Sequence, residues 1–459
     1  MTSDEKIKHL HWRAGFGLTP QAWESQKNET ILSSWEQLRG EAMSFQPAPA
    51  TSPNTAEPVN PREMTAEQRS ASKKKDRQLV FQLNHEWIHQ MADTTSSPLL
   101  ERVALFWHGH FACISRSGLL AFNQLNTLRQ YGLSNFRDLT LAIARDASMI
   151  RFLNNQQNKK EQPNENFARE LMELFTIGRG HYSERDVKEA ARAFTGWSSN
   201  FRGEFVFRKF QHDNGDKSFL GRTGNFNGDD IIDMLLERKE TAHFVAAKAY
   251  RYFVSDQPHP ERIDQLGTIF YESNYDTPTL LDSIFTSDWF YTPEVMGNKI
   301  KSPVELIVGM LRQSQGRILD PPALLNVQRA LGQVLFRPPN VAGWTGGKSW
   351  IDHSTLLLRL HLAGLLFKAA QIDIRLREQA EEPRFGKRLQ KLNAEIDLTP
   401  LQDAAEMVSS EAFLDRLSTY LLPFGVEAPK DTLLAFSSEA NRVNTFVWRM
   451  MSLPEYQLC

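Results

Sequence analysis

Residues 163–178 read PNENFARELMELFTIG and combine a helical pattern with an unusual number of polar side chains. The apolar residues of this segment recur every three or four positions, at Phe167, Leu171, Leu174 and Phe175. Such spacing predicts an amphipathic helix that buries one face. Pro163 and Asn164 are typical of a helix start, and Gly178 follows the last apolar residues as a helix stop.

The polar side chains of this helix are Glu165, Asn166, Arg169, Glu170 and Glu173. Residues four apart on a helix are neighbours, so the spacing predicts ion pairs from Arg169 to both Glu165 and Glu173. Buried polar groups need partners, and Arg192, in the segment 190–197, is a predicted partner for one of the carboxylates. Two interpretations stay open: a structural network of ion pairs, or a catalytic centre in which Glu170 and Glu173 act on a ligand held by the other polar residues.

The same helical spacing recurs along most of the 459 residues, for example at 65–91, 98–111, 303–313 and 354–370. Alternating strand and helix units are absent, which excludes a doubly wound sheet and a barrel. In one stretch, 205–220, Phe205 and Phe207 alternate with Val206 and Arg208 before Asn214-Gly215, a dipeptide suited to a hairpin turn. The sequence therefore predicts an all-α fold, a large multi-helical body with one or two small β-hairpins.

Changes in composition predict five regions along the chain. They are an N-terminal helical segment (1–44), a proline-rich linker or loop (45–62), a helical lobe that contains the polar helix (63–200), a β-hairpin insertion (201–225) and a second helical lobe packed on the first (226–459). The linker is predicted because it carries five prolines among alanine, serine, threonine and asparagine, a composition that cannot bury enough apolar area to order itself.

Composition also limits the classes of function. The formal net charge of −2 argues against a sequence-independent grip on nucleic acid, which needs a basic surface. Only two cysteines are present, which favours a reducing compartment over a disulfide framework. The first residues lack the apolar run of a secretory signal, and the most apolar segment, 356–370, is too short and too charged to span a membrane. We therefore expect a cytoplasmic protein with no membrane span, while export together with a partner stays open.

Residues 106–111 read FWHGHF and place two histidines two positions apart. On a continuous helix these histidines point away from each other, so at most one binds a given metal ion. If the helix ends at Gly109, His108 is able to meet Glu170 or Glu173, as imidazole and carboxylates do in helical metal sites. The alternative is a histidine buried among aromatic rings and hydrogen-bonded to a carboxylate. The cofactor stays unknown, with a divalent metal ion as one candidate.

Residues 211–217 read QHDNGDK and have the composition of a calcium loop. Gly215 and Lys217 stand where that loop needs oxygen ligands, which excludes a calcium hand. His212 and Asp213 are candidates for a general acid and base held on a rigid turn. The alternative is a turn in which the Asp213 side chain binds its own backbone.

Residues 343–349 read GWTGGKS and superficially resemble a phosphate-binding loop. Ala342 stands where that loop needs its first glycine, and Pro338-Pro339 replaces the strand that should precede it, which argues against a nucleotide loop. A turn is the default interpretation. Glycine-rich backbone beside Trp344 and Trp350 also suits the wall of a ligand cleft, because tryptophan stacks on flat or sugar surfaces, and Trp344 is a candidate ligand-binding residue.

Several segments together resemble one bacterial family, catalogued as domain of unknown function 1800. They are 10–17 (LHWRAGFG), 106–111, 163–178, 191–197 (ARAFTGW), 212–213 with 219–221, 301–305 (KSPVE) and 337–344 (RPPNVAGW). The resemblance covers nearly the whole chain and implies no established activity. It implies instead a protein partner similar to sulfatases and alkaline phosphatases, of a kind that is often exported.

The sequence thus supports two hypotheses about function. The first is a hydrolase-like or metal-assisted enzyme, or an accessory subunit, that acts with a sulfatase- or phosphatase-like partner. The second is a non-catalytic binding or scaffold protein whose polar motifs form a buried structural network. The sequence gives no indication of the reaction, the substrate or the oligomeric state.

Overall fold

The computed structural model describes residues 2–26, 28–44, 60, 63–368, 392–423, 426 and 428–459, together with the backbone of 374–375 and 388–389. Helices make up most of these residues, and the strands form only two-stranded antiparallel pairs, so the predicted all-α fold with small hairpins is confirmed. The proline-rich segment predicted at 45–62 lies, apart from Asn60, outside the described residues.

The first ten helices lead from the N-terminus to the polar motifs. They are α1 (Ser3–Arg13), α2 (Pro20–Gln26), α3 (Ile31–Ser44), α4 (Ala66–Ala92), α5 (Pro98–His110), α6 (Gly118–Tyr131), α7 (Phe136–Ala144), α8 (Ala147–Phe152), α9 (Asn166–Glu170) and α10 (Glu184–Ala193). The later helices are α11 (Gly228–Leu236), α12 (Lys239–Phe253), α13 (Pro260–Glu272), α14 (Thr277–Phe285), α15 (Pro303–Gln313), α16 (Pro321–Leu331), α17 (His353–Leu366), α18 (Thr399–Glu406), α19 (Ser410–Leu421), α20 (Lys430–Leu434) and α21 (Arg442–Met451).

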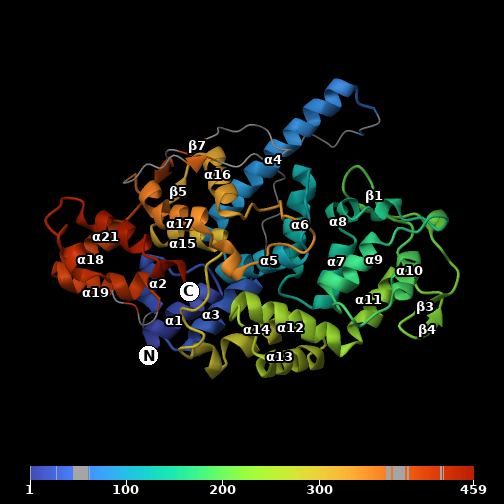
Figure 1. Cartoon of the computed structure of the whole chain (residues 1–459), viewed down its shortest axis with the longest axis horizontal. Helices are drawn as coiled ribbons and strands as arrows, with labels where there is room; N and C mark the ends of the chain where they lie inside the picture. The colour runs from blue at the N-terminus through green and yellow to red at the C-terminus, as the bar shows by residue number, and fades with distance from the viewer. Residues whose placement is uncertain are drawn as a thin grey trace.

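The strands lie between helices as short ribbons. The pairs are β1 (Trp197–Ser199) with β2 (Phe205–Phe207), β3 (Lys217–Phe219) with β4 (Arg222–Gly224), β5 (Arg317–Ile318) with β8 (Ala394–Glu395), and β6 (Ile374–Arg375) with β7 (Arg388–Leu389). The C-terminal helices α18, α19 and α21 occupy one end of the molecule, beside the N-terminal α1 and α2, whereas α10 and the strands β1, β3 and β4 occupy the other end (Figure 1).

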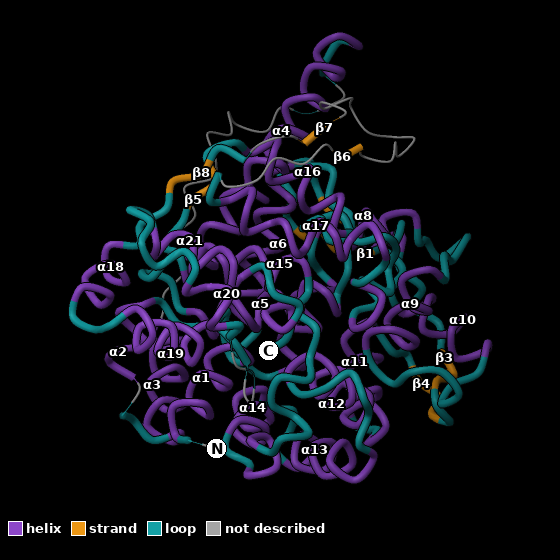
Figure 2. The backbone as a smooth tube through the Cα atoms, turned by 60° about the vertical axis from the view of Figure 1, so that its left-hand side comes forward, coloured by secondary structure: helices purple, strands orange, loops and turns teal. Residues whose placement is uncertain are grey.

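Helix α5 forms the centre of the core. All of its residues except Gly109 are buried, and both views place it near the middle of the molecule (Figure 1, Figure 2). It contacts α3, α4 and α6. The Trp107 indole is fully buried and donates to the carbonyl oxygen of Gly132 at 2.9 Å, so the one polar atom of this large ring is satisfied.

Local capping fixes where several helices begin. A capping box precedes α4, because Gln68 N–H donates to the Thr65 hydroxyl at 3.2 Å and the Gln68 side chain accepts from Thr65 N–H at 2.8 Å. The same reciprocal arrangement precedes α1, α10, α11, α15 and α17. Each box satisfies backbone donors that the first helical turn leaves without partners.

The polar motif folds into two kinds of helix instead of one. Helix α9 ends at Glu170, and the next five residues, Leu171–Phe175, wind as a π-helix. The predicted stop at Gly178 is correct, since Gly178 has a φ of +76° and its N–H donates to the carbonyl oxygen of Met172 at 2.9 Å. A π-helical turn is wider than an α-helical turn, so side chains beyond Glu170 no longer follow the four-residue register used for the prediction.

The prediction of a hairpin turn at Asn214-Gly215 is wrong. The two hairpins of this region turn at 200–204, between β1 and β2, and at 220–221, between β3 and β4. Asn214 and Gly215 lie in the connection between the hairpins, where Gly215 N–H donates to the Asp213 carboxylate at 2.8 Å. The side chain of Asp213 thus shapes this turn, and no strand pairing spans it.

Candidate functional site

The polar side chains of α9 are engaged in ion pairs. Arg169 binds Glu165 at 3.0 Å, as predicted, but its second partner is Glu184 at the start of α10, at 2.7 Å. Glu173 pairs instead with Arg179, whose Nε donates to it at 2.7 Å. The predicted pair between Arg169 and Glu173 is therefore wrong, because the π-helix carries Glu173 out of register with Arg169.

Glu170 is the exception among these residues. It is half-buried and makes no hydrogen bond or ion pair with another described residue. Burial, together with the nearby Glu173 carboxylate, raises the pKa of Glu170 above its usual value. Asn166 lies one turn earlier, and its side-chain amide donates to the carbonyl oxygen of Leu153 at 3.3 Å. Glu170 thus retains acceptor capacity for a ligand, whereas Asn166 ties the helix to the preceding segment.

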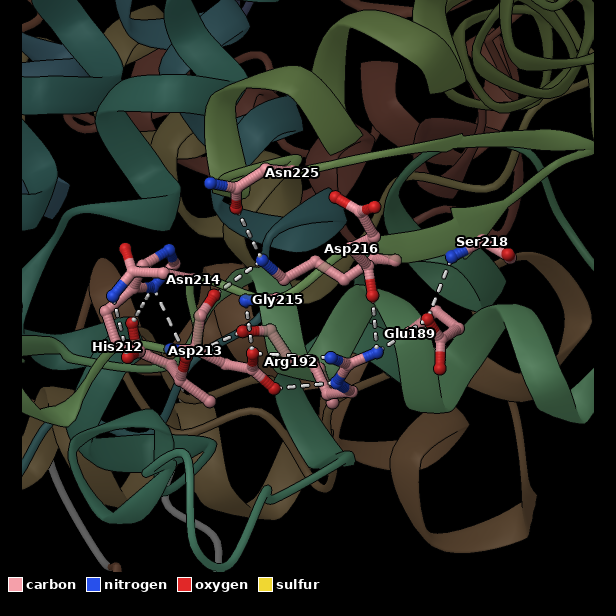
Figure 3. Close-up of polar contacts among 12 residues, drawn as sticks. Glu189, Arg192, His212, Asp213, Asn214, Gly215, Asp216, Ser218 and Asn225 are labelled. Carbon is pink, nitrogen blue, oxygen red and sulfur yellow. Dashed lines mark hydrogen bonds and ion pairs between the residues drawn. The ribbon is translucent and has the colours of Figure 1, made fainter.

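Arg192, His212 and Asp213 come together at the end of α10 (Figure 3). The Arg192 guanidinium donates to Asp213 through Nε at 2.7 Å and to Glu189 through Nη1 at 2.9 Å. Its partners are therefore carboxylates of its own region, and the predicted pairing with a carboxylate of the polar helix is not seen. Burial disfavours the ionised Asp213, but the hydrogen bonds from Arg192 outweigh this effect and hold the pKa of Asp213 below its usual value.

Neighbouring groups complete this cluster. Lys217 is fully buried, and its ammonium donates to the backbone oxygen of Asp213 at 2.5 Å and to the side chain of Asn225 at 3.2 Å. His212 Nδ1 lies 2.8 Å from the backbone oxygen of Thr195, which favours the tautomer with the proton on Nδ1. The donors and acceptors of this cluster therefore bind one another, as expected for a structural hydrogen-bond network that fixes the 212–218 loop to α10.

His108 lies apart from both groups. Helix α5 continues to His110, so Gly109 does not end it, and His108 Nε2 accepts a hydrogen bond from Phe336 N–H at 3.0 Å. Its ring lies against Trp87, Phe336 and Trp344, with centroids 5.2, 5.2 and 5.7 Å away. Burial lowers the pKa of His108 to about 3, so the ring is neutral at pH 7.

The expected meeting of His108 with Glu170 or Glu173 therefore does not occur. The structure instead brings His108 together with Trp344, a predicted ligand-binding residue. The alternative prediction is a histidine buried among aromatic rings and hydrogen-bonded to a carboxylate. The aromatic rings are present, but the hydrogen-bond partner of His108 is the backbone N–H of Phe336. Across the described residues, no three His, Cys, Asp or Glu side chains are grouped so as to hold a metal ion.

A pocket of about 390 Å³ opens next to Trp344. Its walls come from α5, from α12, from the segment 299–305 at the start of α15, and from the loop 340–350. These segments include the predicted FWHGHF and GWTGGKS motifs and the KSPVE motif, which are far apart in the sequence. A concave site of this size, built from aromatic walls and a few polar groups, is typical of small-ligand binding.

Positive charge predominates in the pocket. Lys248 and Arg251 contribute from α12, and Lys299 lies beside Glu305. Glu305 is fully buried and forms an ion pair with Arg102 and another, at 3.4 Å, with Lys299. Burial alone would raise the pKa of Glu305, but Arg102 and Lys299 outweigh it and hold the pKa well below the usual range. One buried carboxylate thus faces two cations, which leaves a net positive charge at this wall.

Glycines allow the loop to close over the pocket. Gly343, with a φ of +78°, packs so closely on the backbone oxygen of Gly109 that a Cβ would clash with it. Gly347, with a φ of +58°, packs in the same way against the carboxylate of Asp256. Both positions therefore need glycine for conformation and for space, and they bring Trp344 to the mouth of the pocket.

The pocket is joined to the polar motif through the end of the π-helix. His110 Nε2 lies 3.0 Å from the backbone oxygen of Phe175, and Lys248 Nζ donates to that of Leu174 at 3.1 Å. Burial, with a further contribution from Arg251, lowers the pKa of Lys248 to about 8. His110 Nδ1 makes no hydrogen bond in the described part of the chain. Burial and the nearby Lys248 hold the pKa of His110 well below its usual value, which keeps the ring neutral.

Sequence reasoning missed most residues of this pocket. Lys248 and Arg251 lie on a helix whose pattern gives no reason to select them, and Lys299 lies in an irregular segment. Glu305 belongs to the KSPVE segment, which was noted only for its family resemblance. The available indication was Glu305 itself, because an acidic residue in a run of apolar positions needs a cationic partner when it is buried.

Comparison with known proteins supports the family assignment. Residues 9–458 match the family described as "Protein of unknown function (DUF1800)". No curated protein and no solved structure gives a significant match. In the described residues, none of the helices combines the length and the apolar character that crossing a bilayer requires. The match spans nearly the whole chain, so this protein belongs to the DUF1800 family.

Proposed function

We propose that the protein binds a small anionic ligand that carries a ring, in the pocket between α5, α12, α15 and the 340–350 loop. The observation that carries this proposal is the convergence of Lys248, Arg251 and Lys299 on a cavity whose mouth is formed by Trp344. Cations in a partly desolvated pocket favour an anionic group, and an indole face favours a flat or sugar ring.

The anionic part of the ligand is expected near Lys299. Arg102 and Lys299 both pair with the single carboxylate of Glu305, so among these three groups positive charge exceeds negative charge. A carboxylate, phosphate or sulfate group would supply the missing negative charge. Arg251 stands at the exposed side and is held only loosely by Asp256, at 3.8 Å, which leaves its guanidinium available to the same group.

Under this proposal the polar motifs have mainly structural roles. Arg169 and Arg192 use their guanidinium groups on carboxylates of the protein, which supports the structural-network hypothesis for Glu165, Asp213 and their neighbours. Catalytic roles for His108, Glu170, Glu173, His212 and Asp213 stay predictions, as does the sulfatase- or phosphatase-like partner. Glu170 is the best supported of the five, because its carboxylate has no protein partner among the described residues.

A hydrolytic step on the bound ligand is a second candidate function, and His110 favours it. The contact with the Phe175 carbonyl favours the proton on Nε2, which leaves Nδ1 as an unprotonated acceptor with no partner in the described chain. A neutral imidazole beside a pocket is able to take a proton from a water molecule or from a ligand hydroxyl. Two observations together would support this candidate. The wild-type protein hydrolyses a bound ester, and a His110→Gln variant binds the same ester without hydrolysing it.

Calorimetric titration with a matched panel tests the binding proposal. The panel pairs ring compounds that carry a carboxylate, phosphate or sulfate with neutral analogues of the same ring. We expect binding of the anionic members only, and a loss of about tenfold in affinity in an Arg251→Met variant, the effect of one lost charged contact. Lys348→Met, which removes an exposed lysine of the 340–350 loop that does not line the pocket, is the control and should bind as the wild type does. Equal binding by both variants, or no binding of any anionic member, would contradict the proposal.

A further inference from the structure

A second surface stands out at the end of the molecule that carries β1 and β3. Residues 201–210 read FRGEFVFRKF, and three of their phenylalanines are exposed: Phe201 by 42%, Phe207 by 40% and Phe210 by 74%. No other phenylalanine of the described residues is exposed to this degree. Large apolar side chains in water are costly, so three of them within ten residues of one segment point to a surface that meets another phase or molecule.

Basic side chains alternate with these rings. Arg202, Arg208 and Lys209 form no ion pair with another described residue, and the one acidic residue of the segment, Glu204, accepts a hydrogen bond from Asn200 at 2.7 Å. Lys160 lies next to this segment, because its N–H donates to the backbone oxygen of Gln211 at 2.9 Å. The segment 201–210, which we call the aromatic-basic tip, therefore combines three exposed rings with a net positive charge of its own.

We propose that the aromatic-basic tip docks the protein on an anionic lipid bilayer, as a peripheral contact. Phenylalanine rings enter the interfacial layer of a bilayer, while arginine and lysine bind the lipid phosphates around them. The tip is suitably placed, since β1 and its neighbours lie at the edge of the molecule, opposite α18, α19 and α21 (Figure 1). Charge complementarity selects this occupant over an uncharged apolar partner, which would leave three cations desolvated without counter-charges.

Single-stranded nucleic acid also combines negative charge with surfaces that stack on rings, but its usual sites are long basic grooves. The tip is one short hairpin with the turn that follows it, and its three basic residues are few for such a groove. This proposal does not depend on the ligand pocket, because the tip and the pocket share no residue.

Vesicle co-sedimentation tests the proposal with the full chain. Vesicles of phosphatidylcholine with about 30% phosphatidylglycerol are compared with vesicles of phosphatidylcholine alone, at low salt and at about 0.5 M salt, where surface attraction is largely screened. We expect binding to the anionic vesicles only, weakened at least fivefold by the higher salt. Phe210→Ser and the double variant Arg208→Glu/Lys209→Glu should each lose at least fivefold in affinity.

Met407→Ser provides the matched control, because Met407 is an apolar side chain of similar exposure, 80%, and follows α18 at the far end of the molecule. It should bind the vesicles as the wild type does. All variants change exposed side chains, and circular dichroism confirms that each is folded. Equal binding to neutral vesicles, equal losses in Phe210→Ser and Met407→Ser, or displacement from vesicles by a single-stranded oligonucleotide that binds more tightly would each overturn the proposal.

Discussion

Lys248 on α12 donates a hydrogen bond to the backbone oxygen of Leu174, 3.1 Å away, in the π-helical turn of the polar motif. The bond satisfies a carbonyl group that the end of the helix leaves without a partner, and it places an ammonium group at the wall of the pocket. The motif that dominates the sequence therefore contributes to the pocket through its backbone, while most of its charged side chains bind one another.

Trp344 should determine the affinity for the ring of the ligand. A Trp344→Ala variant removes the indole at the mouth of the pocket without cutting a hydrogen bond that holds the fold. We expect a loss of about tenfold or more in affinity, because a stacked ring contributes roughly 1–3 kcal/mol. Calorimetry with the best anionic ligand measures the loss. The melting temperature should change little, and a large drop in melting temperature with unchanged affinity would assign Trp344 a structural role instead.

The buried ion pairs of Glu305 should matter far more for stability than exposed pairs. A Glu305→Gln variant leaves Arg102 and Lys299 buried without their carboxylate. We expect the free energy of unfolding to fall by about 3–5 kcal/mol, the usual cost of a buried charge without a partner. Urea unfolding measures it. Glu237→Gln, which breaks the exposed pair with Arg222, is the control and should leave the free energy of unfolding nearly unchanged.

His108 should make the protein sensitive to acid. Its folded pKa of about 3 lies below the ordinary value of 6.5, so the unfolded chain binds the proton more readily and stability is lost as the pH falls from 6.5 towards 3. Between pH 6.5 and 5 the wild type should lose about 2 kcal/mol more than a His108→Gln variant. Urea unfolding at both pH values gives the comparison, and parallel losses in the two proteins would contradict the assignment.

Asp146 should have the opposite dependence on pH. Burial raises its pKa from 3.8 to about 7, although the N–H groups of Met149 and Ser148 oppose the shift. The folded state then binds the proton more readily, so stability from this group falls as the pH rises from about 4 to 7. Asn is an equally good helix cap, so Asp146→Asn should keep α8 and remove this dependence. The variant should gain about 2–3 kcal/mol relative to the wild type between pH 5 and 7. If the difference in unfolding free energy between the two proteins stayed constant across this range, the raised pKa of Asp146 would be contradicted.

Helix boundaries were predictable from sequence where the cause is local. The capping box at Thr65 and the stop at Gly178 depend only on residues within one turn, and both are present. The turn at Asn214-Gly215 was misplaced for a tertiary reason. Arg192 and Lys217 bind around Asp213 and hold this segment as a connection, while the second hairpin turns at Leu220-Gly221, which carry φ angles of +46° and +81°.

The candidate site was only partly predictable. Trp344 was identified because glycine-rich backbone beside tryptophan is a local pattern. Arg169 and Glu165 pair as their spacing predicts, but the π-helix changed every relation beyond Glu170, and no pattern of side chains predicts that wider turn. The cations of the pocket could not be predicted from the sequence, because they form a binding site only when α5, α12 and α15 pack together. Lys248 in isolation is an ordinary helical lysine.

The most direct test of the account is a crystal structure of the protein with the tightest anionic ligand from the titration panel. We predict density for the anionic group within hydrogen-bonding distance, about 3 Å, of Lys299 or Lys248, with the ring lying against Trp344. A ligand bound elsewhere on the protein while this pocket holds only solvent would contradict the account.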